Sequence, residues 1–198
     1  MAAMAGLGEF PDLVRGTFVN HEKNNAGIYG VRFYIRGKPW VVSVDDIHLF
    51  RYPTLNPAYL VFARQSQDNN AIWGSVLEKA WAKVKGNYLN ANGDLVKNGL
   101  RALTGIPVFS YPTSEINSTA ELDIAFARLK AADDAGYVML TSTAGDGDDS
   151  IYNHCGVAKS HAYTIISVFE MTHSNGTVLK MMLLRNPWSS TGYSYDWH

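Results

Sequence analysis

Residues 160–188 constrain the fold more than any other part of this chain, because they form the pattern of two β-strands joined by a tight turn. Residues 162–169 and 178–184 are apolar, β-rich runs, and Asn175-Gly176 between them is a strong signal for a two-residue hairpin. In an antiparallel hairpin the start of one strand lies beside the end of the other. The sequence therefore predicts that His161 and Asn186 come to the same end of this hairpin.

The exact register decides how close the two side chains come. Ideal pairing about Asn175-Gly176 places Asn186 opposite Ile165, which shares a face with His161. Bringing Asn186 beside the imidazole itself requires a β-bulge or a more asymmetric loop. Spacing alone favours a hairpin that carries a His and an Asn at its end for ordinary capping reasons.

The first half of the chain mixes short helices with strands. Residues 1–8 favour a helix, and a second short helix follows Pro11, a residue suited to the first helical turn. The pattern predicts β-strands over residues 28–35, 40–44 and 59–62, the first two separated by a turn over residues 36–39.

Two longer helices follow. The clearer one starts near Ala71 and stops at Gly86. Its apolar positions recur at three- and four-residue steps, which is typical of a core-facing helix: Trp73, Val76, Leu77, Ala80, Trp81 and Val84. The other has Ser118 as N-cap, Glu121 three residues on as a capping box, and Gly136 at its end. Its inner face is predicted to carry Leu122, Ala125, Phe126 and Leu129. A helix-rich first half followed by a strand-rich second half predicts an α+β fold.

Charge and cysteine content exclude several classes of function. A formal net charge of -1 and a pI near 6.6 give no electrostatic reason to expect nucleic acid or an anionic membrane as a partner. No apolar run approaches the length of a membrane span. The single cysteine rules out an intrachain disulfide and favours a reducing compartment, so we expect a cytoplasmic protein.

A His beside an Asn has a specific chemical use. A cysteine nucleophile acts as its thiolate, which a neighbouring imidazolium stabilises. An amide oxygen on the other ring nitrogen fixes the orientation and tautomer of the imidazole, as in a Cys-His-Asn triad. Trp188, two residues after Asn186, would shield the bond between His161 and Asn186 from water.

Several segments together resemble the protease core of the calpain family of cysteine proteases. The His and Asn blocks of that family are similar to HAY at residues 161–163 and LRNPW at residues 184–188. The family's strand pair and its two aspartates are similar to NNAGIYGVRFYIRGKPWVVSVDD, residues 24–46. Its most recognisable helix is similar to IWGSVLEKAWAKVKGNY, residues 72–88, and the Thr104-Gly105 pair also falls in place. The resemblance covers nearly the whole chain.

The resemblance implies a papain-like α+β fold and an intracellular endopeptidase. Residues 1–110 would be the remainder of a helical lobe, and residues 111–198 a β-rich lobe that ends before its last strands. His161 would be the general base and acid, Asn186 the residue that orients it, and Trp188 their aromatic cover. The implied partners are a protein or peptide substrate and the regulatory domains or subunits of a longer parent chain.

The nucleophile is missing from the matched positions. In the family's register the catalytic Cys would lie about three residues before Met1, and the glutamine of the oxyanion hole further upstream. Cys155 lies six positions before His161 in a polar loop, on the wrong side for a nucleophile that must come from the opposite lobe. We therefore expect Cys155 to be a loop thiol and residues 1–198 alone to be inactive.

Other departures fall on the substrate cleft. The Gly that usually precedes the catalytic His is Ser160, and the second of two cleft glycines is Asp94, next to Gly93. Glycine permits close approach of the backbone, so a side chain at these places would narrow or recharge the cleft.

Departures at calcium positions leave no confident cofactor. The acidic ligands that the family has before the helix Trp and after the NPW block are Ala71 and Gly192 here. Because calcium takes six to eight oxygen ligands, this weakens the case for calcium activation. The cluster Asp146, Asp148 and Asp149 lacks the remaining features of an EF-hand loop and is better explained as a solvated loop.

Two alternatives remain open at this stage. The chain could be a catalytically dead calpain-like scaffold or protein-binding module, which the changed cleft residues favour. The residues encoded upstream of Met1 would discriminate, since Gly-x-Cys-Trp there indicates an enzyme. An unrelated α+β domain that binds a small molecule would require all the matched segments to be coincidental.

Overall fold

The computed structural model describes residues 1–51, 59–63, 71–91 and 93–188, and its contacts divide the chain into two compact units. The first unit consists of Met1 and Phe10–Val108, and the second of Ala2–Glu9 and Phe109–His198. Helices and strands occur in both, which confirms the predicted α+β class. The assignment of the chain to two protease lobes stays a prediction, and residues 2–9 pack with the second unit rather than the first.

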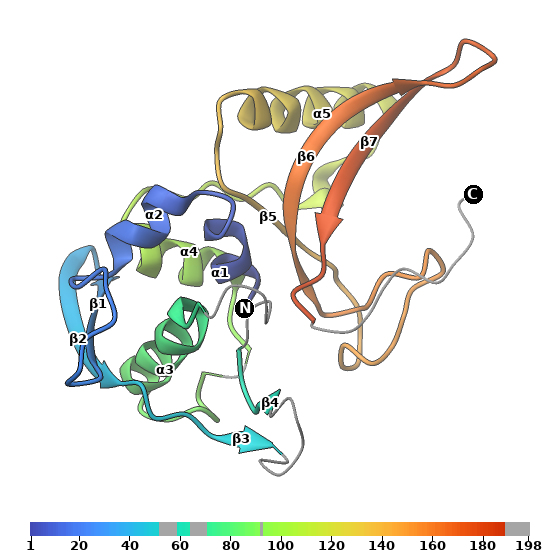
Figure 1. Cartoon of the computed structure of the whole chain (residues 1–198). Coiled ribbons are helices and arrows are strands. Elements are labelled where there is room, and N and C mark those ends of the chain that lie inside the picture. Colours follow the sequence, from blue (N-terminus) through green and yellow to red (C-terminus); the bar gives the residue numbers. More distant parts are fainter. Residues whose placement is uncertain (52–58, 64–70, 92, 189–198) are drawn as a thin grey trace. The chain divides into compact units, whose positions relative to one another are not determined.

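The first unit is built on a β-hairpin (Figure 1). Its elements are α2 (Pro11–Thr17), β1 (Ile28–Ile35), β2 (Lys38–Asp45), β3 (Phe50–Arg51), β4 (Tyr59–Leu60), α3 (Trp73–Lys85) and α4 (Val96–Thr104). β1 and β2 pair antiparallel from Ile28 opposite Asp45 to Ile35 opposite Lys38. The turn is the two-residue Arg36-Gly37, with φ of 51° and 76°, and not the predicted four residues, so Pro39 lies within β2.

The core of the first unit lies between this hairpin and α3. The largest fully buried side chains are Phe33 and Val31 from β1 and Leu77 and Val76 from α3. The predicted helical face is therefore buried as expected, and the ring of Trp81 packs 5.5 Å from that of Phe33. The helix stops at Gly86, whose φ of 96° few other residues adopt readily.

The sequence analysis missed α4. Its signal was present, since Val96, Leu100 and Leu103 recur at four- and three-residue steps before Gly105. Gly105 adopts the left-handed conformation, and a Cβ there would lie 2.7 Å from the ring of Tyr34. Glycine is therefore required both for the turn and for the close approach to β1.

The second unit is a three-stranded antiparallel sheet with helices on its faces (Figure 1). Its elements are α1 (Ala2–Leu7), the short 3-10 helix η2 (Thr113–Glu115), α5 (Thr119–Asp134), β5 (Met139–Ser142), β6 (Ala162–Thr172) and β7 (Val178–Arg185), with strand order β5-β6-β7. Within the described residues no helix is long and apolar enough to cross a membrane.

The two helices of the second unit pack on opposite faces of the sheet. Phe126, Leu129 and Ala132 of α5 contact a buried cluster that contains Met139 and Ile165, which pair across β5 and β6. Side chains alternate along a strand, so the neighbouring pair Leu140 and Thr164 faces the other way. That face receives α1, where the hydroxyl of Thr164 donates to the carbonyl of Ala2 at 3.0 Å and a Cβ on Gly6 would touch Leu140.

The predicted start of α5 is confirmed in its cap. Ser118 accepts the backbone N–H of Glu121 at 3.2 Å. The carboxylate of Glu121 reaches back to the N–H of Asn117 at 2.8 Å, one residue before the N-cap, and also accepts the hydroxyl of Ser118. The inner face predicted for this helix was wrong at Leu122, whose side chain is 54% exposed.

Candidate active site

The connection between β6 and β7 is longer than the two residues expected. Thr172 pairs with Val178, which leaves the five residues His173–Thr177 in the loop. The N–H of His173 donates to the carbonyl of Thr177 at 2.8 Å and closes it, and Gly176 in it has a φ of 86°. Compared with ideal pairing about Asn175-Gly176, this loop moves β7 by one position relative to β6.

A β-bulge at Ile166 adds a second shift in the same direction. Ile166 has no partner on β7, and beyond it Thr164 pairs with Arg185. The next residue, Asn186, therefore lies two positions nearer to His161 than ideal pairing predicts. The sequence analysis required a bulge or an asymmetric loop. The structure has both, and together they bring the carboxamide to the imidazole.

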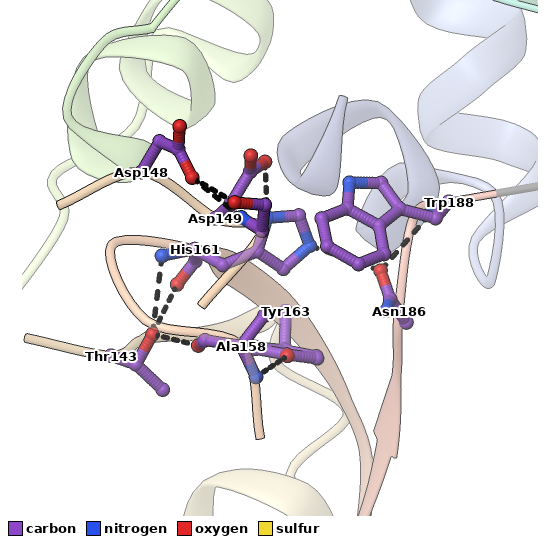
Figure 2. A network of polar contacts seen from close by, with 9 residues as sticks. Thr143, Asp148, Asp149, Ala158, His161, Tyr163, Asn186 and Trp188 are labelled. Atoms are coloured by element: carbon purple, nitrogen blue, oxygen red, sulfur yellow. Dashed lines mark hydrogen bonds and ion pairs between the residues drawn. The ribbon is translucent and has the colours of Figure 1, made fainter. Parts of the chain in front are cut away.

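The side chains of His161 and Asn186 are hydrogen-bonded. Nε2 of His161 lies 3.0 Å from Oδ1 of Asn186, and His161 is only 9% exposed. Because a carboxamide oxygen can only accept, this contact places a proton on Nε2. The backbone N–H of Trp188 donates to the same oxygen at 3.0 Å, and the indole ring lies 4.5 Å from the imidazole (Figure 2). The structure thus brings together three of the residues predicted from the sequence.

The other ring nitrogen of His161 faces Asp149, a contact that the sequence analysis missed. Nδ1 lies 3.3 Å from Oδ2 of Asp149, whose side chain is half exposed. Figure 2 shows the imidazole between Asp149 on one side and Trp188 with Asn186 on the other. A carboxylate accepts hydrogen bonds, so an imidazole protonated on both nitrogens satisfies both neighbours. In a Cys-His-Asn triad, the nitrogen that faces away from the Asn is the one that faces the sulfur.

The loop before His161 is tied down close to the imidazole. The hydroxyl of Thr143 donates to the carbonyl of Ala158 at 2.6 Å and accepts the backbone N–H of His161 at 3.1 Å. The phenol oxygen of Tyr163 accepts the N–H of Ala158 at 3.0 Å, and its ring packs edge-on against the imidazole at 4.9 Å. Burial raises the pKa of Tyr163 above its ordinary value. These contacts fix the backbone on which His161 sits (Figure 2).

Ser160 is strained in a way that explains why glycine is expected at this place. Its φ is 47°, a left-handed conformation that costs a non-glycine residue free energy. The hydroxyl of Ser160 donates to the carbonyl of Gly145 at 2.8 Å, which compensates in part by joining the two ends of the loop. The side chain is therefore engaged within the loop.

Gly93 and Asp94, the other predicted cleft residues, belong to the first unit. Gly93 has a φ of 70°, and a Cβ there would meet open space. The carboxylate of Asp94 pairs with Lys85 at 2.7 Å and accepts the side-chain N–H of Asn98 at 2.9 Å. Lys85 is the main reason that the pKa of Asp94 lies below its ordinary value. Their place in a substrate cleft stays a prediction.

Cys155, the single cysteine, is exposed at a turn of the same loop. Its backbone N–H donates to Oδ1 of Asn153 at 2.9 Å, and the N–H of Val157 donates to the same oxygen. Asn153 therefore organises this turn through its side chain, and Cys155 contributes backbone to it. The role of a loop thiol stays a prediction.

The expectation that calcium has no confident site stays a prediction. Ala71 has no carboxylate, and Gly192 lies outside the described residues. Of the acidic loop residues, Asp148 accepts the N–H and hydroxyl of Ser150, whereas Asp149 faces His161. Their oxygens are therefore engaged separately, and no group of three or more His, Cys, Asp or Glu in the described part of the chain could hold a metal ion.

Comparison with known proteins gives a consistent family. The family described as calpain family cysteine protease matches residues 1–198. The calpain-type cysteine protease DEK1 of Zea mays is 33% identical over 197 residues, which is 96% of this chain and 8% of that protein. Calpain-5 of Caenorhabditis elegans is 33% identical, with 87% of this chain and 28% of its own length covered. The calpain-2 catalytic subunit of Homo sapiens is 30% identical, with 89% of this chain and 24% of its own length covered.

The family match covers every residue of the chain. The chain itself spans less than a third of the length of these curated relatives. This chain belongs to the calpain family of cysteine proteases.

Proposed function

We propose that this chain is the His- and Asn-bearing core of a calpain-type cysteine endopeptidase, whose nucleophile is a cysteine outside these 198 residues. The observation that carries the proposal is the 3.0 Å contact between Nε2 of His161 and Oδ1 of Asn186, made by a nearly buried imidazole under an indole. A loop of five residues and a β-bulge are both needed to produce this contact, which argues against incidental capping of a hairpin.

In the proposed reaction His161 transfers one proton in each of two steps, the formation of the thioester and its hydrolysis. Nδ1 takes the proton of the thiol, and the thiolate attacks the carbonyl carbon of the scissile peptide. The imidazolium then donates that proton to the leaving amine as the C–N bond breaks and a thioester forms. Nδ1 next accepts a proton from water, whose oxygen attacks the thioester carbon. The C–S bond breaks, the carboxylic acid product leaves, and the imidazolium returns its proton to the thiolate to regenerate the thiol.

Asn186 acts on the opposite side of the ring. Its oxygen accepts a hydrogen bond from Nε2–H. The neutral imidazole is therefore held in the tautomer in which Nδ1 can accept a proton from a thiol. Trp188 packs against the imidazole and excludes water from this bond. A hydrogen bond in a drier environment is stronger, so the cover increases the effect of Asn186.

The test uses the full parent chain and an unstructured protein substrate. His161→Ala should abolish turnover, and Asn186→Ala should lower kcat by roughly tenfold to a hundredfold with little change in KM, as expected for a group that orients a general base. His154→Ala is the control, because His154 is an exposed histidine outside the β6–β7 hairpin. Full activity of the His161 variant would disprove the proposal.

A catalytically silent calpain-like scaffold is the second candidate. The contact of Asp149 with Nδ1 of His161 favours it, because Nδ1 is the nitrogen that a thiol would need. Iodoacetamide labelling of the parent chain separates the two candidates. An enzyme should have one cysteine whose alkylation slows when His161 is replaced by alanine, whereas a scaffold should have none.

The surroundings of this activity follow from the same proposal. The substrate is a protein or peptide, and the parent chain carries further regulatory domains, since the relatives are several times longer than this chain. The single cysteine of these residues suits a reducing compartment such as the cytoplasm. Cell fractionation and size-exclusion chromatography of the parent chain test these points.

A further inference from the structure

A carboxylate at the end of α5 contacts the backbone of β6 just past its bulge. Oδ2 of Asp133 accepts the backbone N–H of Val168 at 2.8 Å and the hydroxyl of Ser167 at 3.1 Å. Ile166, the residue without a partner on β7, immediately precedes these two. Asp133 therefore binds the strand at the point where its register with β7 changes.

The sheet explains why β6 needs a side chain there. β5 pairs with β6 only as far as Met139 opposite Ile165. Beyond Ile165 no strand of the described residues pairs with this edge of β6, and Val168 is 1% exposed. A buried N–H without an acceptor costs free energy. The carboxylate of Asp133 supplies that acceptor in place of a neighbouring strand.

The position of Asp133 is otherwise unfavourable. Asp133 and Asp134 are the last two residues of α5, where the partial negative charge of the helix end disfavours a carboxylate. Asp134 is exposed and pairs with Lys130 at 2.8 Å, an ordinary pair four residues apart on a helix surface. Asp133 is half-buried and turned toward the sheet instead. The two neighbours thus have the same charge and different uses.

The bulge has a consequence for the candidate active site. It supplies one of the two register shifts that bring Asn186 beside His161. Because successive side chains of a strand point to opposite faces, a slip of one residue would move Asn186 away from the imidazole. Whatever holds the bulge in place therefore also holds Oδ1 of Asn186 at Nε2.

We propose that Asp133 is a positioning residue for the reaction: by binding β6 at Ser167 and Val168 it holds the bulge at Ile166, and through the bulge it sets Asn186 against His161. Asp133 touches neither the imidazole nor the substrate in this role. The proposal rests on the proposed function for its catalytic consequence, whereas its structural part, the dependence of the His161–Asn186 contact on Asp133, can be measured separately.

Three variants of the full parent chain test it. Asp133→Ala removes the oxygen that accepts both hydrogen bonds. It should lower kcat by about tenfold or more with KM nearly unchanged, because a small misplacement of an orienting group has a large effect on the chemical step. Asp133→Asn keeps an oxygen that can accept both hydrogen bonds and should recover most of kcat. Asp134→Ala, the matched control, removes the same charge from the same helix end and should leave kcat unchanged.

A second readout does not depend on turnover. With ¹⁵N-labelled histidine, the ring nitrogens of His161 report whether Nε2 still donates to Asn186. Asp133→Ala should shift the Nε2 resonance as Asn186→Ala does, whereas Asp134→Ala should not. A merely structural role would lower the Tm of Asp133→Ala by a few degrees, about 2–8 °C, without moving this resonance at temperatures where the protein is folded.

The outcomes separate the two proposals. If the parent chain is active and Asp133→Ala changes neither kcat nor the Nε2 resonance, the positioning role is overturned and the proposed function stands. If the parent chain shows no turnover that depends on His161, the proposed function fails, and the resonance alone then decides whether Asp133 sets the contact.

Discussion

Both units have packed apolar cores, but the second unit also buries an imidazole among hydrogen-bonded groups at one end of its sheet. In the first, Val31, Phe33, Val76 and Leu77 have almost no exposed surface. In the second, His161 and Thr164 are buried polar side chains, each with a hydrogen-bond partner. Regular packing builds the units, whereas an irregular loop and a β-bulge place Asn186 beside His161. Predictions that separate stability from site geometry test this contrast.

The largest effect is expected from the core of the first unit. Leu77→Ala removes a side chain that is 0% exposed, and should lower the free energy of unfolding by about 2–5 kcal/mol through lost contacts and a cavity. Leu89→Ala, at a position that is 80% exposed, is the control and should change it by less than about 0.5 kcal/mol. Urea denaturation measures both. Equal effects of the two substitutions would show that the first unit is not stabilised by its packed core.

A smaller effect, on reactivity instead of stability, is expected at Asp149. Nδ1 carries at most one hydrogen, which cannot be donated to a carboxylate and a thiolate at the same time. Asp149 must therefore move away from Nδ1 before the nucleophile pairs with His161. Asp149→Ala should therefore raise the rate of alkylation of the nucleophile in the parent chain by about threefold to tenfold, the modest effect of removing a half-exposed ionic contact.

Asp146→Ala is the control for that experiment, since it removes the same charge from the same loop. A fall in the alkylation rate for Asp149→Ala alone would mean that Asp149 supports the imidazolium instead of competing for it. In that case Asp149 would belong to the hydrogen-bonded groups of the second unit that hold His161 in place.

Glu78 gives a weaker, pH-dependent contribution in the first unit. Burial raises the pKa of its carboxyl above the ordinary 4.5, although its Oε2 accepts the N–H of Ala63 at 2.6 Å. The folded state thus binds the proton more tightly than the unfolded chain. The free energy of unfolding should fall as pH rises from about 4.5 through the raised pKa. Glu78→Gln keeps the acceptor for Ala63 and should remove this fall.

Denaturation curves at several pH values measure the effect, with Glu22→Gln at an exposed position as control. The difference in stability between Glu78→Gln and the unmodified protein should grow with pH. If instead the substitution costs stability increasingly at high pH, the carboxylate is stabilising in its charged form and the assignment of its pKa shift to burial is wrong.

The smallest effect is expected at Cys155. Cys155 is exposed, and its backbone N–H donates to Oδ1 of Asn153. Cys155→Ser should therefore leave both the melting temperature and the activity of the parent chain unchanged within about twofold, as for most exposed substitutions. Loss of activity in this variant would identify Cys155 as the nucleophile and overturn the proposed source of the thiol.

The regular parts of the fold could be predicted from the sequence because they depend on local periodicity. The apolar steps from Trp73 to Val84 predicted α3, and Ser118 with Glu121 predicted the start of α5. Proximity of His161 and Asn186 followed from hairpin topology and the family resemblance. The actual contact did not, because it depends on a bulge at Ile166 that no local sequence signal marks.

The missed site residues share one physical reason. Asp133 and Asp149 act across 35 and 12 positions of the sequence, on Val168 and His161. Such contacts depend on how a helix end and a loop pack against the sheet, and a carboxylate that faces a buried partner has no sequence signal that distinguishes it from the exposed Asp134 or Asp146. Sequence patterns predict the helices and strands, whereas packing decides which of several aspartates contacts a buried group.

The shared oxygen of Asn186 has a consequence for how this site tolerates sequence change. That oxygen accepts from the ring of His161 and from the main chain of residue 188, not from the indole of Trp188. Substitution of Trp188 therefore removes the aromatic cover and leaves the second donor to the carboxamide in place. Only proline, which has no N–H, would remove it. Asn186, which anchors the imidazole, therefore does not depend on the side chain of Trp188, which covers it, even though the two residues lie two positions apart.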